Sequence, residues 1–297
     1  MEEYPLWTAV VTPMNADTSI DYTSFETMLR KQEEAGIGVL VLGSTGEGLN
    51  INTEEKKELV KFVKSLKLSV PMMAGLGGFL IDEQKAFIHF CDEVGVDAFL
   101  LVAPIYAKPG MEGQLSWFSE LMKETTTPCM IYNVPSRTGI KIHPHVPVFL
   151  NKAFPNYMGM KEASGSVEDF KKYRDSAPGA KLYCGDDNLI TELVAEGAVG
   201  HVSVASNAWP KATMHFLKLN LVGSTQYLFR DWVACADLFF DAPSPVPVKA
   251  LLEHKGWISC DEVRSPLSLD DLDSRTEEGL LEADKRVNEW YEELIEQ

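Results

Sequence analysis

The sequence predicts an α/β protein folded as a (β/α)8 barrel, and three observations point to this fold. Eight short apolar segments recur every 20–33 residues along the chain. Stretches with the periodicity of amphipathic helices separate them. Glycine-containing turns lead from these helices into the next apolar segment. Eight strands alternating with seven or eight helices form a parallel sheet, and eight strands close into a barrel. A doubly wound open sheet of two halves is the alternative, but no interdomain linker is evident.

The expected strands are the segments rich in Val, Leu, Ile and Met. They cover residues 8–11, 39–42, 72–74, 99–102, 129–132, 157–160, 181–184 and 201–204. Strands of a parallel barrel are covered on both faces, so continuous apolar runs are expected rather than alternating ones.

The helices between the strands have recognisable ends. Residues 22–35 and 53–65 carry apolar side chains on a single stripe, and we expect Asp21 and Thr53 to be their N-caps. Three helix-to-strand turns contain a glycine that can end a helix in the left-handed conformation at little steric cost, namely Gly36, Gly95 and Gly197.

The last strand leaves roughly a third of the chain for another element. This part has helical patterns at residues 211–221, 225–241, 247–255 and 274–296. We therefore expect a barrel over residues 1–210 and a C-terminal helical extension over residues 211–297.

Composition excludes several classes of protein. The chain has 44 acidic and 27 basic residues, a net charge of −17, which argues against a nucleic-acid or anionic-membrane partner. Its five cysteines are scattered, with no C-x-x-C, so we expect reduced thiols and a cytoplasmic protein. The acidic N-terminus does not resemble a signal peptide, and no apolar run is long enough for a membrane span.

Chemistry in a barrel takes place at the carboxyl ends of its strands. The loop Gly43-Ser44-Thr45-Gly46-Glu47-Gly48 follows the second strand. Its hydroxyls and backbone N–H groups could hold a carboxylate or phosphate, although a plain turn that needs glycine is equally compatible.

A lysine, two tyrosines and an arginine lie at other strand ends. Lys161 follows an apolar strand; desolvation there lowers the pKa of an amine and makes it a nucleophile for a carbonyl, whereas an amine that reaches water stays inert. Tyr132 could relay protons, and Arg137 could bind a carboxylate, or both could belong to a solvated turn. Tyr106 read alone is more typical of packing.

Together these pieces resemble the pyruvate-dependent Schiff-base aldolase family, which includes the N-acetylneuraminate lyases. The resemblance is carried by Gly-Ser-Thr-Gly-Glu at 43–47, Tyr-Asn-Val-Pro-Ser-Arg-Thr-Gly at 132–139 and Lys-Glu-Ala-Ser-Gly at 161–165. It is greatest to the branch that condenses pyruvate with L-aspartate 4-semialdehyde to 4-hydroxy-tetrahydrodipicolinate, in lysine and diaminopimelate biosynthesis. The family fold is a (β/α)8 barrel with a helical extension.

The resemblance implies a role for each candidate residue. Lys161 forms an imine with pyruvate, and Tyr132 and Ser44 relay protons. Tyr106 joins this relay from a neighbouring subunit. The residues implied to bind substrate or line its pocket are Thr45 (pyruvate carboxylate), Arg137 (semialdehyde carboxylate), Gly185 and Val202. The resemblance further implies a homotetramer, a dimer of tight dimers, and a reaction without metal or organic cofactor.

Several alternatives stay open. Ser44 is common in N-acetylneuraminate lyases, but Arg137 favours the semialdehyde. A 2-keto-3-deoxy sugar acid aldolase, a metal-dependent aldolase and a catalytically silent binding protein are further possibilities. His143 and His145 form an H-x-H pair, a weak metal signal.

Regulation by lysine is not expected. The positions that match the lysine-binding residues of inhibited relatives carry Gly48, Leu49, Thr53, Lys56, Phe79, Glu83 and Ile105. Only Glu83 is retained, and Lys56 would repel a cationic ligand.

Overall fold

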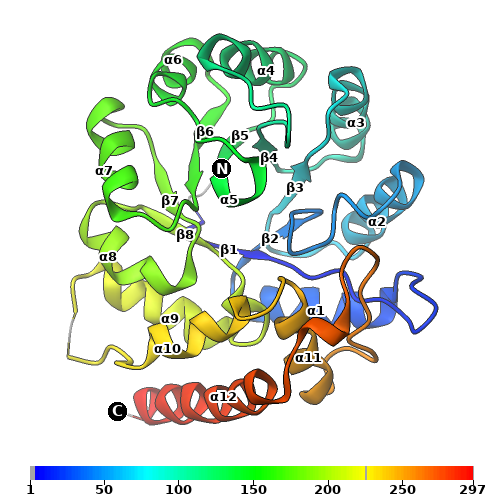
Figure 1. Ribbon diagram of the computed structural model, residues 1–297, viewed down its shortest axis with the longest axis vertical. Coiled ribbons are helices and arrows are strands. Elements are labelled where there is room, and N and C mark those ends of the chain that lie inside the picture. Colours follow the sequence, from blue (N-terminus) through cyan, green and yellow to red (C-terminus); the bar gives the residue numbers. More distant parts are fainter. Residues whose placement is uncertain (1–3, 225, 297) are drawn as a thin grey trace.

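A computed structural model of the chain describes residues 4–224 and 226–296, and it confirms the predicted barrel. Eight parallel strands pair in chain order, and β8 closes the sheet against β1 (Figure 1). The strands are β1 (Leu6–Ala9), β2 (Gly38–Val41), β3 (Met72–Leu76), β4 (Ala98–Val102), β5 (Cys129–Asn133), β6 (Tyr157–Glu162), β7 (Leu182–Cys184) and β8 (Gly200–Ser203).

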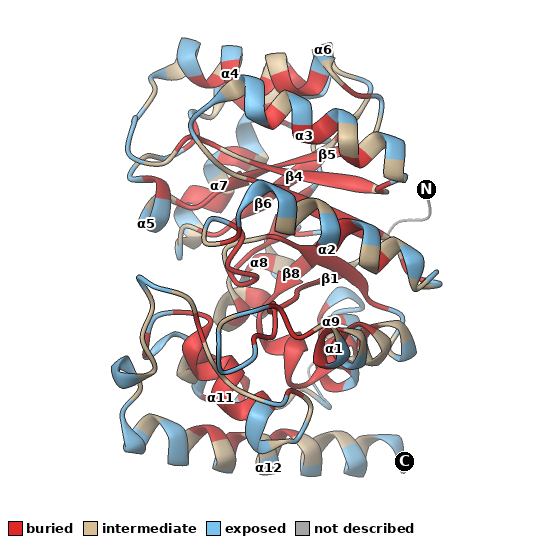
Figure 2. Cartoon of the chain, turned by 90° about the vertical axis from the view of Figure 1, so that its right-hand side faces the viewer, coloured by how far each residue is buried: buried red, intermediate tan, exposed pale blue. Residues whose placement is uncertain are grey.

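Every strand overlaps its predicted segment, because each forms part of the buried centre of the molecule (Figure 2). The largest shift is at β1, which begins two residues before the predicted segment at 8–11. The added part of β1 contains Trp7, whose ring lies over Gly38 of β2, where an added Cβ would come within 2.6 Å of the indole. Only glycine leaves room for this large side chain inside the barrel.

A ring of helices surrounds the strands, with their buried faces inward and their exposed faces outward (Figure 2). They are α1 (Tyr22–Glu34), α2 (Thr53–Ser65), α3 (Ile81–Val94), α4 (Met111–Lys123), α6 (His145–Ala153), α7 (Val167–Ser176), α8 (Ile190–Ala195) and α9 (Pro210–Leu221). The short helix α5 (Pro135–Thr138) lies inside this ring, over the end of the barrel (Figure 1), and short 3-10 helices occur at Asp187–Leu189 and Ala205–Asn207. Gly36, Gly95 and Gly197 have positive φ, as predicted.

One predicted N-cap is confirmed and one is wrong. The Asp21 carboxylate accepts hydrogen bonds from the first backbone N–H groups of α1. At α2 the cap is Asn52: its side chain accepts from Glu55 N, and the Glu55 carboxylate accepts from Asn52 N. This reciprocal capping box satisfies two N–H groups and makes Thr53 the first helical residue instead of the cap.

The C-terminal extension crosses one side of the barrel, where α12 lies along α10 and α11 (Figure 1). Its helices are α10 (Trp232–Asp237), α11 (Val246–His254) and α12 (Ser274–Ile295), with 3-10 helices at Leu238–Phe240 and Leu269–Asp271. The predicted boundary at residue 210 falls at the start of α9, a helix that packs against α8 and β1 and is counted here with the ring; the division into a barrel and an extension stays a prediction.

The single helix predicted over residues 225–241 is wrong, since the described residues before Trp232 form turns; Thr225 lies outside the described residues. Tertiary contacts fix the start of α10. The Trp232 ring stacks on Phe216 at 4.3 Å between centroids, and its indole N–H donates to Asp187 O at 2.9 Å.

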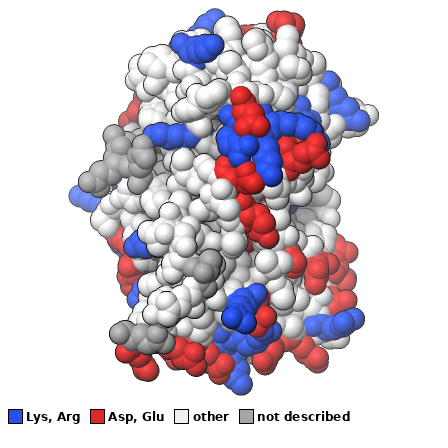
Figure 3. Space-filling view, turned by 90° about the vertical axis from the view of Figure 1, so that its left-hand side faces the viewer, with Lys and Arg blue, Asp and Glu red and all other residues white. Residues whose placement is uncertain are grey.

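The outer face over α7 and α8 carries acidic and basic side chains intermixed (Figure 3). Lys171 and Arg174 of α7, for example, both pair with Glu196. None of the helices among the described residues combines the length and apolar character that crossing a membrane requires.

Candidate active site

A cavity of about 430 Å³ opens where the strands of the barrel end. Three of the predicted site residues line it: Ser44 after β2, Tyr132 near the end of β5, and Arg137 in α5. Residues at the carboxyl ends of β3 and β4 complete the wall on this side, namely Gly75, Leu76, Gly77, Leu100 and Val102. The cavity therefore lies where a barrel places its chemistry.

Strand pairing brings Lys161 next to Tyr132. The two residues are directly opposite each other in the register of β5 and β6. Side chains alternate along a strand, so both point into the barrel while Asn133 and Glu162 point outward. Lys161 Nζ lies 4.5 Å from the centroid of the Tyr132 ring. With 5% of Lys161 and 8% of Tyr132 exposed, the amine lies in a mostly dry pocket beside a phenol.

Gly185 borders this pocket, and Val202 belongs to the buried cluster inside the barrel. An added Cβ at Gly185 would lie 2.8 Å from Lys161 Cε, so glycine leaves the space that the lysine occupies. Val202 is fully buried in the inner cluster that also contains Tyr132 and Tyr183. The structure thus brings together Lys161, Tyr132, Gly185 and Val202.

The loop after β2 has an unusual backbone. Leu42 and Glu47 both have positive φ, at 60° and 52°, and Gly48 N donates to Gly43 O at 3.0 Å. An added Cβ at Gly48 would come within 2.0 Å of Leu42 O, so the loop closes tightly on itself. Ser44 is half-buried and faces the cavity, whereas Thr45 beside it is buried and does not line the cavity with a side chain.

Arg137 and Tyr106 lie on the exposed side of the site. Pro135 begins the short helix α5, and Gly139 ends it with φ 73°. Arg137 lies between them, is exposed to solvent and lines the cavity. Tyr106 is 87% exposed, has φ 66° and is not part of the wall, although its neighbour Ile105 is. Within one chain, therefore, Tyr106 stays apart from Lys161.

Glu162 is a buried carboxyl beside the lysine that sequence reasoning missed. It is 0% exposed; Oε1 accepts from Asn133 Nδ2 at 2.8 Å and from Ser164 N at 3.1 Å, while Oε2 has no hydrogen-bond partner. Burial raises the pKa of Glu162 to about 7, against the hydrogen bonds that lower it. The apolar strand signal ended at Met160, so nothing in the sequence marked its burial.

The extension also contributes to the cavity, which sequence reasoning did not anticipate. Ser244, Pro266 and Leu267 all line it. They lie far along the chain from the barrel strands, and only the folded path of the extension brings them to the mouth.

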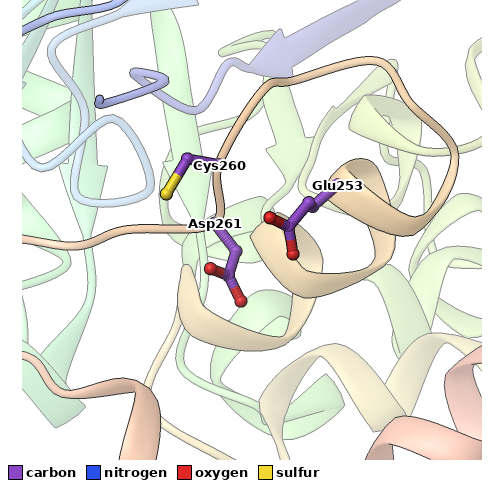
Figure 4. Close-up of side chains that lie close together, drawn as sticks. All are labelled: Glu253, Cys260 and Asp261. Carbon is purple, nitrogen blue, oxygen red and sulfur yellow. The ribbon is translucent and has the colours of Figure 1, made fainter. Parts of the chain in front are cut away.

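One group of three possible metal ligands occurs in residues 4–224 and 226–296: Glu253 at the end of α11, with Cys260 and Asp261 on the following loop (Figure 4). None of the three lines the cavity. His143 and His145 are exposed, and the ring Nδ1 of His143 accepts from His145 N at 3.2 Å.

Comparisons with known proteins agree with this geometry. The sequence profile of the Dihydrodipicolinate synthetase family matches residues 4–282. The chain is 42% identical over 292 residues to 4-hydroxy-tetrahydrodipicolinate synthase of Francisella philomiragia, with 97% of each chain covered.

Solved structures show the same relationship. The 4-hydroxy-tetrahydrodipicolinate synthase of Methylacidiphilum fumariolicum superposes with a TM-score of 0.92 at 30% identity, over 99% of both chains. Dihydrodipicolinate synthase from Acinetobacter baumannii, solved in complex with pyruvate, gives a TM-score of 0.88 at 30% identity over 96% of this chain and 99% of that one. On its sequence and its fold alike, this chain belongs to the Dihydrodipicolinate synthetase family.

Proposed function

We propose that this chain condenses pyruvate with L-aspartate 4-semialdehyde, through a Schiff base on Lys161, to give 4-hydroxy-tetrahydrodipicolinate. The observation that carries the proposal is the pairing of Lys161 with Tyr132 in a nearly dry pocket beside the cavity. The names of the relatives support this synthase over the sugar-acid aldolases and over a silent barrel.

The reaction follows from the amine. Lys161 attacks the ketone of pyruvate, and loss of water gives a cationic imine. This imine withdraws electrons from the neighbouring methyl group, which loses a proton and forms an enamine. The enamine carbon attacks the aldehyde of the second substrate. The amino group of that substrate then adds to the imine carbon, which closes the ring and releases Lys161.

The other residues take the roles that their positions allow. Tyr132, whose ring centroid lies 4.5 Å from the amine, relays its protons together with Ser44, which lines the same cavity as Tyr132. The loop at Ser44 and Thr45 holds the carboxylate of pyruvate. Arg137, on the solvent side of the cavity wall, binds the carboxylate of the semialdehyde with parallel hydrogen bonds. The residues used here supply each step without a metal or organic cofactor.

A second copy of the chain supplies Tyr106, in a tight dimer that pairs into a homotetramer. The dimer is supported by large apolar side chains that are exposed in the segments following β2, β3 and β4, with Leu49 at 55%, Phe79 at 53% and Tyr106 at 87%. Apolar groups gathered in this way are typical of a protein interface. The positive φ of Tyr106 indicates a strained position of the kind found at functional sites.

We also propose that lysine inhibits the reaction weakly or not at all. Lys56 lines the cavity and is half-buried, and burial lowers its pKa while Glu83 opposes that shift. The positive charge of Lys56 therefore already lies in the field of the Glu83 carboxylate and would repel the amino group of a bound lysine. Half-inhibition by sub-millimolar lysine would contradict this proposal.

The test of function is a pair of assays on the purified protein. We expect turnover of pyruvate with L-aspartate 4-semialdehyde and no cleavage of N-acetylneuraminate. Cleavage of the sugar without turnover of the semialdehyde would assign the chain to the lyase branch. Activity that a chelator abolishes would indicate a metal-dependent aldolase instead.

A further inference from the structure

We propose that Glu47 is a positioning residue for the reaction: through an ion pair with Lys249, it holds the loop that carries Ser44 and Thr45 in the shape that binds the carboxylate of pyruvate. The inference deepens the proposed function and rests on it. It also gives the extension a role in the reaction, because Lys249 belongs to α11.

Both oxygens of the Glu47 carboxylate are bound by the extension. Lys249 Nζ donates to Oε1 at 2.6 Å, and Arg264 N donates to Oε2 at 2.9 Å. Lys249 Nζ donates also to Glu262 O at 2.7 Å. The side chains of Glu47 and Lys249 are both 0% exposed. The pair therefore connects, inside the protein, two segments that lie about 200 residues apart in the chain.

A second attachment lies beside the first. The guanidinium of Arg264 donates to both carboxylate oxygens of Glu55, at 2.8 and 2.7 Å, and to Thr18 O at 3.0 and 2.9 Å. Arg264 thereby fixes the segment whose backbone N–H reaches Glu47. Pro266 and Leu267, which follow it, form part of the cavity wall. The same few residues of the extension thus bind the loop and shape the site.

The loop needs such an attachment because its own conformation is strained. Glu47 has φ 52°, in the left-handed region that is unfavourable for a residue with a side chain. Gly46 O accepts from Thr12 Oγ1 at 2.8 Å, so the segment after β1 and the extension hold two consecutive residues of the loop. Ser44 and Thr45 lie between Gly43 and these two fixed points, and their positions depend on both.

Stability alone does not explain a buried ion pair. Burial lowers the pKa of Lys249, and the charge of Glu47 opposes that shift. Desolvation of two charges offsets most of their attraction, so apolar residues of similar volume often give equal stability. What an apolar pair cannot supply is the directional hydrogen bonding that sets the orientation of the loop.

Three variants separate positioning from stability: Lys249→Met, Glu47→Gln, and the double variant Glu47→Gln/Lys249→Met. In Lys249→Met a buried carboxylate loses its partner, so Tm falls steeply. The double variant has no unpaired buried charge, so it regains most of that loss. The control is Lys255→Met. It removes the ion pair with Asp284 that Lys255 makes at the C-terminal end of α11, the helix that contains Lys249.

The readout is the pyruvate concentration that gives half-maximal trapping of the Lys161 imine by borohydride, with kcat and KM beside it. For the double variant we expect this concentration to rise roughly tenfold, while kcat at saturating pyruvate changes by less than about threefold. The control loses Tm without a change in half-saturation.

Two results would overturn the inference. If the double variant regains Tm and also binds pyruvate like the wild type, the pair is merely structural, and the proposed function stands. If the wild type itself forms no adduct with pyruvate, the proposed function fails and the positioning role fails with it.

Discussion

Gly185 lies against the side chain of Lys161: a methyl group added to Gly185 would come within 2.8 Å of Lys161 Cε and 2.6 Å of Ala163 Cβ. The lysine can rotate away from such a contact, but Ala163 and the nearby backbone cannot. The space that allows the amine to face Tyr132 is therefore set by the residue that follows β7, and β7 lies on the opposite side of β6 from the strand of Tyr132.

This contact predicts the effect of Gly185→Ala. The added methyl group displaces the amine from Tyr132, and a misplacement of about 1 Å costs roughly 10²-fold in rate. We expect kcat to fall by about that factor while the protein remains folded, as measured by steady-state kinetics and circular dichroism. Gly110→Ala is the control, since no atom lies within 4 Å of an added Cβ there. Equal kcat in the two variants would contradict the assignment of Gly185 to the lysine pocket.

Arg137→Met tests recognition of the second substrate. Loss of a charge-assisted hydrogen bond costs about 1.5–3 kcal/mol, which corresponds to a rise in KM for the semialdehyde of roughly 10- to 100-fold. We expect the KM for pyruvate to stay near the wild-type value, because the proposed function assigns the pyruvate carboxylate to the loop at Ser44 instead. Lys141→Met, an exposed cation of the same segment that does not line the cavity, provides the comparison. If only the KM for pyruvate rose, Arg137 would bind pyruvate and not the semialdehyde.

A mixing experiment tests whether Tyr106 acts on a neighbouring subunit. Tyr106→Phe and Lys161→Ala are each expected to be nearly inactive alone. In a mixed dimer, the chain with an intact Lys161 receives an intact Tyr106 from its partner. After dissociation and random reassociation, about a quarter of wild-type activity returns. If Tyr106 acted within its own chain, mixing would restore nothing.

Glu162 predicts a pH dependence of stability. Its pKa is raised to about 7 in the folded protein, so it keeps a proton that the unfolded chain releases near its ordinary value of 4.5. The folded state then binds more protons between these two values, and the free energy of unfolding falls as pH rises through this window. The free energy of unfolding falls by about 3 kcal/mol in total across this window, and Glu162 causes no further change above it.

Glu162→Gln removes this dependence, because the amide does not ionise. Relative to the wild type, the variant gains stability as pH rises from about 5 to about 8. Urea unfolding at the two pH values measures the gain. The matched control is Glu192→Gln, which changes an exposed carboxyl of α8. A difference between Glu162→Gln and wild type that does not change with pH would show that Glu162 is ionised throughout.

The barrel was predictable because its strands are local features. A buried parallel strand is a short apolar run between polar helices, so each of the eight was found within two residues. Helix starts were less predictable. Trp232 begins α10 because its ring stacks on Phe216, and no local pattern records that contact. The cap at Asn52 was missed because the neighbouring Thr53 is also a good capping residue.

The candidate site likewise has residues that the sequence marks and contacts that only the fold reveals. Tyr132 and Lys161 were singled out individually at strand ends, but their contact depends on the register of β5 and β6, which only the resemblance anticipated. Glu47 was noted only as one residue of the glycine-rich loop at 43–48. Its partner Lys249 lies in a helix with nothing local to mark it as buried, so the ion pair emerged only from the fold.

The central claim is that Lys161 forms a Schiff base with pyruvate. Borohydride reduction in the presence of pyruvate, followed by intact and peptide mass spectrometry, tests it most directly. We expect one pyruvate-derived adduct per chain, on the peptide that contains Lys161, and none in Lys161→Ala. A folded protein that forms no adduct, or forms it on another lysine, would contradict the account.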